Sequence, residues 1–172
     1  MLRNPWRDRG RHDLVHLRDG VGIGRPGDRE RDDALRTAYE ATDYRVLAAG
    51  GPFSIRCGGT CAPLDALLAA ANAESWAFIT ASNPRSVRLD DAENLRRHEA
   101  LVEAVRRRGL AHHPAIGVGD DGSWPAEQSL LVLGIDKAEA VALGRAFEQF
   151  AVVVGRRGGP ARLAWIPRDR SA

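Results

Sequence analysis

The sequence predicts an α+β domain, and three observations support that prediction. The chain has 172 residues, a length that suits one domain. Hydrophobic residues make up 44% of the chain and charged residues 28%, enough for both a buried core and a polar surface. From Trp76 onward, apolar and amphipathic segments follow in the order strand, helix, strand, strand, helix, strand. That order predicts a ferredoxin-like, split βαβ core: a mixed, mainly antiparallel sheet with helices packed on it.

The first part of the chain differs in composition from the rest. Residues 1–31 are rich in Arg, Asp and Gly, and they bury too little apolar surface to offset the entropy of ordering. We expect a flexible tail there; a start codon set too far upstream and an arm that grips a partner are the alternatives. Residues 20–27 (GVGIGRPG) lack the Gly-Lys-Ser/Thr ending of a phosphate-binding loop, so that function is rejected. The domain is expected over residues 32–167, with a C-terminal tail over residues 168–172.

Strands are expected where short apolar segments lie between turn residues, and helices where apolar residues repeat every three to four positions. The segment WAFITA is almost continuously apolar, which predicts a central strand buried on both faces. An N-terminal hairpin around Gly50-Gly51-Pro52 and a C-terminal strand after Gly158-Gly159-Pro160 are expected to extend the core. The expected strands cover residues 44–49, 53–57, 76–81, 114–118, 129–135, 151–155 and 162–166, and the expected helices residues 32–42, 63–73, 91–108 and 137–149.

The helix over residues 91–108 has the clearest boundaries. Asp90 is expected to cap its N-terminus, with Glu93 as the reciprocal partner and Leu89 as a hydrophobic staple. Asp136 and Glu139 form a similar pair before the last helix. The apolar stripe of the helix over residues 91–108 is expected to consist of Leu95, Val102 and Val105.

The predicted topology brings distant segments together at one end of the sheet. Strands 76–81 and 129–135 become antiparallel neighbours in its centre. The exit of the first strand (residues 82–89), the hairpin loop (residues 119–128) and the junction after the last helix (residues 148–150) then converge. We expect a polar rim at this end, where the N-terminus of helix 91–108 favours an anionic group.

Polar residues of the three converging segments are the candidates for a site at this rim. Glu127 stands at the start of a buried strand and is the candidate general base. The candidate ligand-binding residues are Asn83, Ser86, Asn94, Trp124, Ser129 and Gln149.

Structural roles for several of these residues stay open as alternatives. Asn83 and Ser86 also suit turns, and Asp120 and Asp121 belong to an Asp-Asp-Gly turn pattern that outweighs a catalytic or cation-binding role. Trp124 suits a cap on the core, and Gln149 a helix cap. Asn94 and His98 lie one turn apart and also fit a hydrogen-bonded structural pair.

Composition excludes or disfavours several classes of function. The 25 basic and 23 acidic residues give a net charge of +2, which does not favour binding to nucleic acid. Cys57 and Cys61 do not make a disulfide framework or a four-ligand zinc site, so they are expected to be free thiols; no metal site is predicted, and the sequence leaves the question of a cofactor open. Neither a membrane span nor a signal peptide is present in the sequence, so a cytoplasmic location is expected.

Four ordered blocks of the chain resemble a known bacterial family. They are WAFITASNPRS, the DDAEN of the helix start, GDDGSWPAEQSLLVLGI and AFEQFAVVVG. The family is domain of unknown function thirty-two ninety-three, and the resemblance covers about residues 40–166. It implies a small stand-alone bacterial protein and supplies no activity, substrate or cofactor. A larger residue is expected in the family at the position of Ser82, which implies a more open rim in this chain.

Two functions follow from these observations. The first is a small-ligand site, with or without catalysis, at the polar rim, for a ligand that carries an anionic group. The second is a non-catalytic protein-interaction or regulatory module, because sheets of this type also pair through an exposed face or edge and a homo-oligomer is compatible with the chain. A polar pocket beside a partly buried Glu127 favours the first, and a contiguous exposed apolar patch favours the second.

Overall fold

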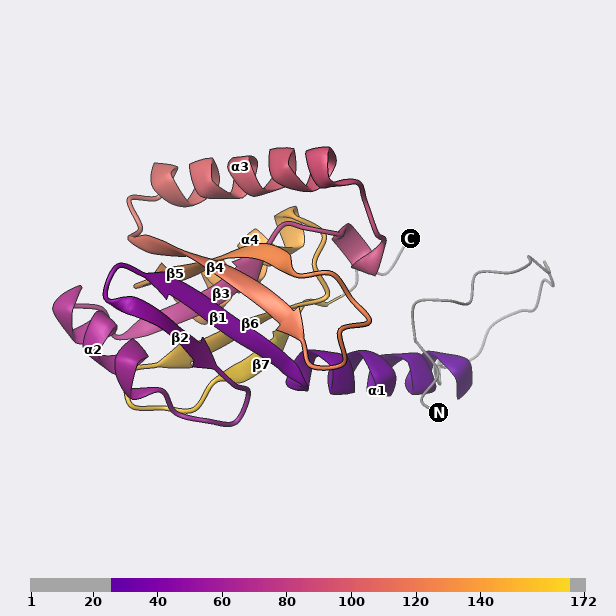
Figure 1. Ribbon diagram of the computed structural model, residues 1–172, viewed down its shortest axis with the longest axis horizontal. Coiled ribbons are helices and arrows are strands. Elements are labelled where there is room, and N and C mark those ends of the chain that lie inside the picture. Colours follow the sequence, from indigo (N-terminus) through magenta and orange to yellow (C-terminus); the bar gives the residue numbers. More distant parts are fainter. Residues whose placement is uncertain (1–25, 168–172) are drawn as a thin grey trace.

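Seven antiparallel strands form the centre of the molecule, and helices lie on both sides of them (Figure 1). The computed structural model describes residues 26–167. The strands are β1 (Thr42–Ala48), β2 (Gly51–Ile55), β3 (Ser75–Thr80), β4 (His112–Gly119), β5 (Glu127–Leu133), β6 (Ala151–Arg156) and β7 (Arg162–Trp165). Their spatial order is β2-β1-β4-β5-β3-β6-β7. The structure is therefore an α+β fold, and β3 and β5 are antiparallel neighbours in its centre, as predicted.

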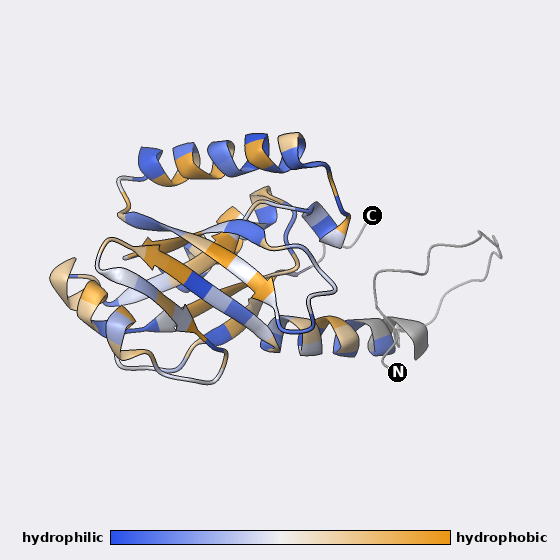
Figure 2. Ribbon diagram, in the orientation of Figure 1, coloured by the Kyte–Doolittle hydropathy of each residue, from blue (hydrophilic) through white to orange (hydrophobic). Residues whose placement is uncertain are grey.

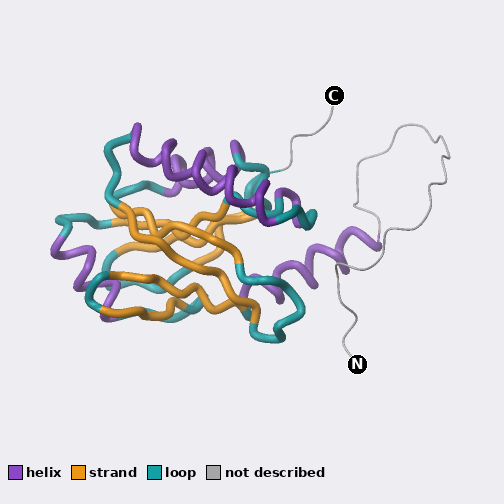
Figure 3. The backbone as a smooth tube through the Cα atoms, turned by 45° about the horizontal axis from the view of Figure 1, so that its top comes forward, coloured by secondary structure: helices purple, strands orange, loops and turns teal. Residues whose placement is uncertain are grey.

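The described chain has four α-helices; three of them lie against the sheet, and the first extends away from its edge, as Figure 3 shows from a second direction. They are α1 (Pro26–Glu40), α2 (Ala62–Ala70), α3 (Asp91–Arg107) and α4 (Lys137–Ala146), and the short 3₁₀ helix η1 (Pro84–Ser86) precedes α3. The helix α3 connects β3 to β4, and α4 connects β5 to β6. Within residues 26–167, every helix is too short or too polar to span a membrane.

The side chains of the sheet alternate between two hydrophobic cores. In β5, Leu131 and Leu133 pack in the core that contains the α2 leucines, whereas Leu130 and Val132 pack in the core under α3 and α4. The two faces of the sheet are thus covered by different helices. Figure 2 shows hydrophobic residues along the strands and alternation of hydrophobic and hydrophilic turns in α3. This double burial explains why the strand segments are nearly continuously apolar in sequence.

The sheet curls until the segments at its two edges meet. The chain after β2 pairs with the chain before β7 through a bridge between Cys57 and Ala161. Two hydrogen bonds support it: Gly58 N–H donates to the Ala161 carbonyl over 2.8 Å, and Ala161 N–H donates to the Gly59 carbonyl over 2.9 Å. The face occupied by α2 is therefore enclosed, while the other face supports α3 and α4.

The helix boundaries follow the expected capping residues in part. Asp90 Oδ1 accepts a hydrogen bond from Glu93 N–H, and Asp136 Oδ1 accepts one from Glu139 N–H, both over 2.8 Å. These bonds satisfy orphan amides of the first turn. The reciprocal hydrogen bond expected from the Glu93 side chain is replaced, because the Glu93 carboxylate binds Arg96 of the next turn.

Several sequence-based boundaries need correction. The first helix was expected over residues 32–42, but α1 begins at Pro26, whose fixed φ suits a first helical turn. Residues 26–31, expected in the tail, are therefore helical, while residues 1–25, with most of the GVGIGRPG segment, and residues 168–172 lie outside the described residues. The last helix was expected to reach residue 149, but α4 ends at Ala146 because Glu148 has a φ of 58°, which a helix cannot contain.

Leu95 is also corrected. It was expected in the apolar stripe of α3 with Val102 and Val105, but the structure leaves it 46% exposed, whereas Val105 is buried as expected and Leu101 is buried with it. These two residues share their face with Asn94 and His98, at helical spacing. Leu95 lies one position beside that face, in the N-terminal part of α3.

Candidate functional site

The chain between β3 and α3 follows a strained backbone path. Asn83, Arg85 and Ser86 have φ angles of 47°, 50° and 56°, in the left-handed region that disfavours residues with a Cβ. Each such residue costs about 1–2 kcal/mol. Neighbouring groups hold the loop in this shape: Arg85 N–H donates to the Glu148 carbonyl over 2.8 Å, and Asn83 N–H donates to Asn94 Oδ1 over 2.9 Å. The surrounding fold therefore maintains the strain at one end of the sheet.

Asn83 connects this loop to two other elements. Its side chain is buried, and its Oδ1 accepts from Leu89 N–H over 2.9 Å and from Asn94 Nδ2 over 3.0 Å. Its Nδ2 donates to Glu127 Oε1 over 2.7 Å. Because Asn94 also accepts the Asn83 backbone N–H, the two asparagines bind each other in both directions. The loop, α3 and the start of β5 are thus fixed relative to one another.

Glu127 is held through one of its two carboxylate oxygens. Oε1 accepts from Asn83 Nδ2 and also from Trp124 Nε1, the latter over 2.8 Å. No hydrogen bond joins Oε2 to a group that the structure describes. Burial raises the pKa of Glu127, and the hydrogen bonds from Asn83 and Trp124 act against that rise. We call Asn83, Asn94, Trp124 and Glu127 the open cluster, because one oxygen of its carboxylate is left available.

Tyr39 of α1 lies beside the open cluster. Burial raises the pKa of the Tyr39 phenol, the Glu127 carboxylate raises it further, and a hydrogen bond with Ser86 lowers it. The ring of Tyr39 packs edge-on against Trp165, with centroids 5.7 Å apart. The Arg36 guanidinium lies over the other ring of that pair, 5.2 Å from the Trp165 centroid. The end of α1 is therefore anchored where the phenol reaches Glu127 and Ser86.

A cavity of about 360 Å³ opens between the start of α3 and the segment before β5. Its size is at the small end of the range of ligand pockets, about 300–1,000 Å³. Polar, charged and apolar side chains all contribute to its wall. It is lined by Ser82, Asn83, Arg88, Leu89, Asp91, Asn94, Leu95, Pro125, Ala126, Glu127 and Gln128.

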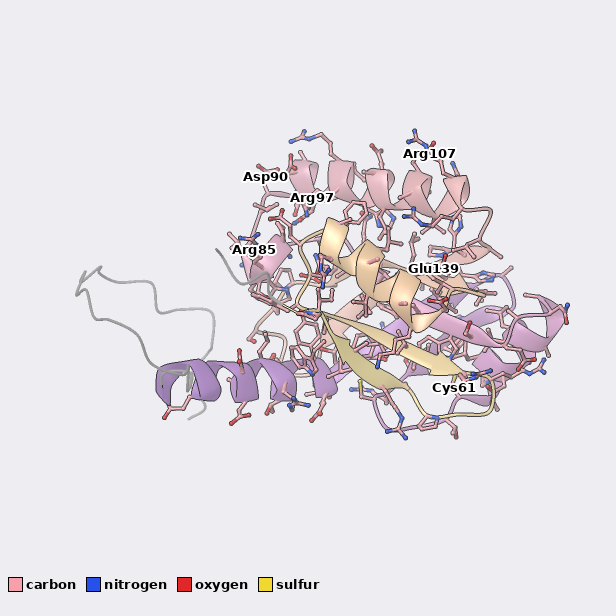
Figure 4. All side chains as sticks on the ribbon, turned by 180° about the vertical axis from the view of Figure 1, so that it is seen from behind. Cys61, Arg85, Asp90, Arg97, Arg107 and Glu139 are labelled. Carbon is pink, nitrogen blue, oxygen red and sulfur yellow. The ribbon has the colours of Figure 1, made fainter. Side chains whose placement is uncertain are left out.

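A second polar group joins the same loop to the junction between α4 and β6. Arg97 donates from Nε to the Ala81 carbonyl over 2.7 Å and from Nη2 to the Phe147 carbonyl over 2.8 Å. Gln149 Nε2 donates to the Ser82 and Phe147 carbonyls over 3.0 and 3.2 Å. We call Arg97 and Gln149 the closed cluster, because their donors are used on backbone carbonyls. Figure 4 shows Arg85, Asp90 and Arg97 together at this end of the molecule, with Glu139 and Cys61 elsewhere.

Three of the predicted site residues line the cavity: Asn83, Asn94 and Glu127. Trp124 binds Glu127, so its indole N–H supports the carboxylate. Ser86 interacts with Tyr39. The hydrogen bonds of the open cluster join two of the three segments expected to converge, and the closed cluster joins the third.

Two predicted residues lie away from the cavity. Ser129 is 1% exposed, and its hydroxyl donates to the Glu127 carbonyl over 3.1 Å within the sheet. Gln149 is buried in the closed cluster. Their contacts are those of residues that hold the sheet and the loop together.

The acidic turn residues have structural partners. Asp120 accepts two hydrogen bonds from Arg56 Nη1, over 2.7 and 2.8 Å. Asp121 Oδ1 accepts from Ser123 N–H over 3.0 Å, as expected for an Asx turn. Both residues lie in the turn that follows β4. Among residues 26–167, no group of three or more His, Cys, Asp or Glu is arranged to hold a metal ion.

Asn94 and His98 do not form the hydrogen-bonded pair that was one alternative for them. Asn94 has the partners described above, but His98 Nδ1 is buried and has no hydrogen-bond partner within the described chain. Burial lowers the pKa of His98; the nearby Glu99 carboxylate opposes this effect, and His112 adds a smaller lowering. The neutral imidazole is therefore favoured at this position.

Four residues of this region were missed as site candidates: Tyr39, Arg88, Asp91 and Leu95. Tyr39 had a usable signal, since a phenol on the apolar face of a helix needs a polar partner when it is buried. Arg88 and Asp91 flank the cap residue Asp90, where a charge is ordinarily a solvated surface group. Only the position of the β4–β5 loop makes them part of a cavity wall.

Comparisons with known proteins add one relationship. A search of curated proteins and a search of solved structures each found no match. Residues 79–152 match the model of a family described as protein of unknown function (DUF3293). The matched segment contains Asn83, Asn94 and Glu127 but not Tyr39. The residues that line the cavity therefore lie in a segment through which this chain resembles the DUF3293 family.

Proposed function

We propose that this protein binds a small polar molecule in the cavity between α3 and the β4–β5 loop. The observation that carries the proposal is the arrangement of Glu127. Glu127 lines the cavity, one oxygen of its carboxylate is fixed by Asn83 and Trp124, and the other has no hydrogen bond to a described group. A ligand that donates a hydrogen bond satisfies that oxygen.

The same arrangement supports Glu127 as a general base. A base needs a fixed position and a pKa closer to the working pH than that of an ordinary carboxylate. The side chains of Asn83 and Trp124 supply the first, and burial, which raises the pKa of Glu127, supplies the second. The proposal therefore includes proton transfer from a bound ligand to Glu127 Oε2, with Tyr39 as the nearest described phenol.

The surface of the described chain offers less support for an interaction module. The large hydrophobic residues exposed there are Leu47 and Leu95, on β1 and α3. Two separate side chains do not make the contiguous apolar patch that marks a stable docking surface. Leu95 also lines the cavity, so its exposure is accounted for by the ligand site.

The proposal extends to the type of fold and to location. The order β4-β5-β3-β6, with α3 and α4 as the two connections, supports a ferredoxin-like core extended by the β1-β2 hairpin and by β7. A bacterial source and a cytoplasmic location remain predictions from the sequence.

A screen of small molecules tests the proposed function. The full chain is titrated with a library of polar metabolites, and binding is followed by melting temperature and by amide chemical shifts of cavity residues. A ligand at about 100 times its Kd stabilises the protein by about 2.7 kcal/mol. The E127Q variant keeps an oxygen acceptor for Asn83 and Trp124 but lacks the carboxylate.

We expect at least one compound that shifts cavity resonances in the wild type and binds E127Q at least about tenfold more weakly. E139Q serves as the matched control, because Glu139 is an exposed acidic residue in the first turn of α4. Equal binding to the wild type and E127Q, or no binding by any compound, overturns the proposal.

A further inference from the structure

Two charges of opposite sign line the cavity beside Glu127, and neither is neutralised by a neighbour. Arg88 and Asp91 are both exposed, and neither forms an ion pair or hydrogen bond with another side chain that the structure describes. They lie three positions apart in the chain and line the same cavity without contacting each other closely enough to pair. A site that keeps a cation and an anion separate is suited to a ligand that carries both.

The other arginines of this region behave differently. Arg85 and Arg97 lie 3.3 and 3.8 Å from the two carboxylate oxygens of Glu148, and Arg96 lies 2.6 Å from Glu93. Each is thus committed to a carboxylate of the protein. Arg88, by contrast, lines the cavity and has no ion pair with another described residue.

The charge balance of the wall disfavours a ligand with a single charge. Asp91 and Glu127 contribute acidic groups, and Arg88 contributes the basic one. A simple anion meets Arg88 but also two carboxylates, and a simple cation leaves Arg88 without a partner. The Asp90 carboxylate already caps the N-terminus of α3, so the anionic group expected in this region is better placed on Arg88.

The apolar part of the wall suggests the rest of the ligand. Leu89 and Leu95 both line the cavity, and Leu95 is 46% exposed although it is large and apolar. A short hydrocarbon group placed between the two charged groups of a ligand covers these side chains. The volume of about 360 Å³ limits the ligand to a small metabolite.

We infer that the cavity binds a small zwitterion of the amino-acid type, with an ammonium group, a carboxylate and a short apolar side chain. The inference rests on the proposed function and specifies its ligand class. The ligand carboxylate binds the Arg88 guanidinium, which is suited to two parallel hydrogen bonds. The ammonium binds Asp91 and the available oxygen of Glu127, and the apolar side chain packs on Leu89 and Leu95.

Four matched probes test the inference on the full chain. They are leucine, N-acetylleucine, leucinamide and N-acetylleucinamide, which share one side chain and carry both charges, only the negative, only the positive, or neither. Binding is measured by calorimetry and by amide chemical shifts of cavity residues. We expect leucine to bind at least about tenfold more tightly than each of the other three, because each lost charged contact costs about that factor.

Charge-removing variants assign the two contacts. R88Q is expected to weaken leucine binding about tenfold and to leave leucinamide binding within about twofold; D91N is expected to do the same to leucine while sparing N-acetylleucine. The controls are R156Q, an exposed arginine at the end of β6 without an ion pair to the described residues, and E139Q in the first turn of α4. All replaced residues are exposed, and urea unfolding verifies that each variant keeps the wild-type stability within about 0.5 kcal/mol.

The outcomes separate this inference from the proposed function. If a singly charged or neutral probe binds as tightly as leucine, or if R88Q and D91N bind leucine like the wild type, the inference is wrong. If no probe binds but a screened compound binds in a manner that depends on Glu127, the inference is wrong and the proposed function stands. If neither the probes nor the screened compounds bind, both are overturned.

Discussion

The open and closed clusters lie on two sides of the same loop, and they use polar groups in different ways. In the closed cluster, Arg97 and Gln149 donate to backbone carbonyls of residues 81, 82 and 147. In the open cluster, Asn83 and Trp124 both donate to one oxygen of Glu127, and the other oxygen is left available at a cavity wall. A closed arrangement stabilises the fold, whereas an open one retains unused binding capacity.

Burial affects the charged groups of the two clusters differently. The side chain of Arg97 is 20% exposed, and its guanidinium has backbone partners and Glu148 nearby. For Glu127, burial is the larger effect, and it raises the pKa despite two hydrogen bonds. The closed cluster therefore stabilises the fold. The open cluster holds a carboxylate of which only one oxygen has hydrogen-bond partners among the described residues.

The largest expected effect is that of N83A. The substitution removes the partner of Leu89 N–H, Asn94 and Glu127, and it forces alanine into a φ of 47°. We expect the free energy of unfolding to fall by about 3 kcal/mol, measured by urea unfolding. N72A is the matched control, since Asn72 has a φ of 50° and is exposed, so it should cost only about 1 kcal/mol. Equal losses would show that the hydrogen bonds of Asn83 contribute nothing.

The second prediction concerns the closed cluster. R97M keeps much of the side-chain volume but leaves the Ala81 and Phe147 carbonyls without the guanidinium. We expect R97M to lower the free energy of unfolding by about 2 kcal/mol. The ligand affinity of the cavity should not change when it is measured under conditions in which the variant is fully folded. R107M, on the exposed side of α3, breaks only an ion pair with Glu103 and should cost less than about 0.5 kcal/mol. A loss of binding in R97M without a loss of stability would contradict the division into two clusters.

The third prediction is the pH dependence introduced by Glu127. Because burial raises its pKa in the folded state, the folded protein binds more protons than the unfolded chain between the ordinary pKa of glutamate and the raised one. The free energy of unfolding of the wild type should therefore be highest below that window and fall as pH rises through it. E127Q removes this decrease and should lie within about 1 kcal/mol of the wild type at neutral pH, at equal or higher stability.

Urea unfolding at a series of pH values measures this difference. E139Q should follow the wild-type profile, because Glu139 is exposed at the start of α4. A stability difference between E127Q and the wild type that stays constant, or that shrinks as pH rises, would contradict the assigned direction of the shift.

The smallest expected effect is a gain. R85G relieves a φ of 50° and loses only a surface ion pair with Glu148, in which Arg85 is 70% exposed. We expect an increase of about 0.5 kcal/mol in the free energy of unfolding. R85A is the control, because it loses the ion pair and keeps the strain. If R85G is less stable than R85A, the left-handed backbone is not a source of strain in this loop.

Much of the architecture could be predicted because it depends on local pattern. The apolar segment WAFITA predicts a buried strand, and β3 is the central neighbour of β5. Asp90 and Asp136 predict the starts of α3 and α4, and both accept the expected backbone hydrogen bond. The ends of elements were less accessible, since α4 ends at a left-handed Glu148, a residue type that gives no sign of such a φ.

The sequence by itself determined the order of elements, the end of the sheet where polar segments converge, and Glu127 as the acidic residue at the start of β5. Only the tertiary structure decided which oxygen of Glu127 is occupied, and that Tyr39, Arg88, Asp91 and Leu95 lie beside or around the site. The reason is physical: periodicity and capping act over a few residues, whereas a cavity wall forms from side chains whose separation is set by the packing of α1, α3 and the β4–β5 loop. The same packing gives the Gln149 amide a hydrogen bond to a buried backbone carbonyl, whereas only one of the two carboxylate oxygens of Glu127 has hydrogen-bond partners among the described residues.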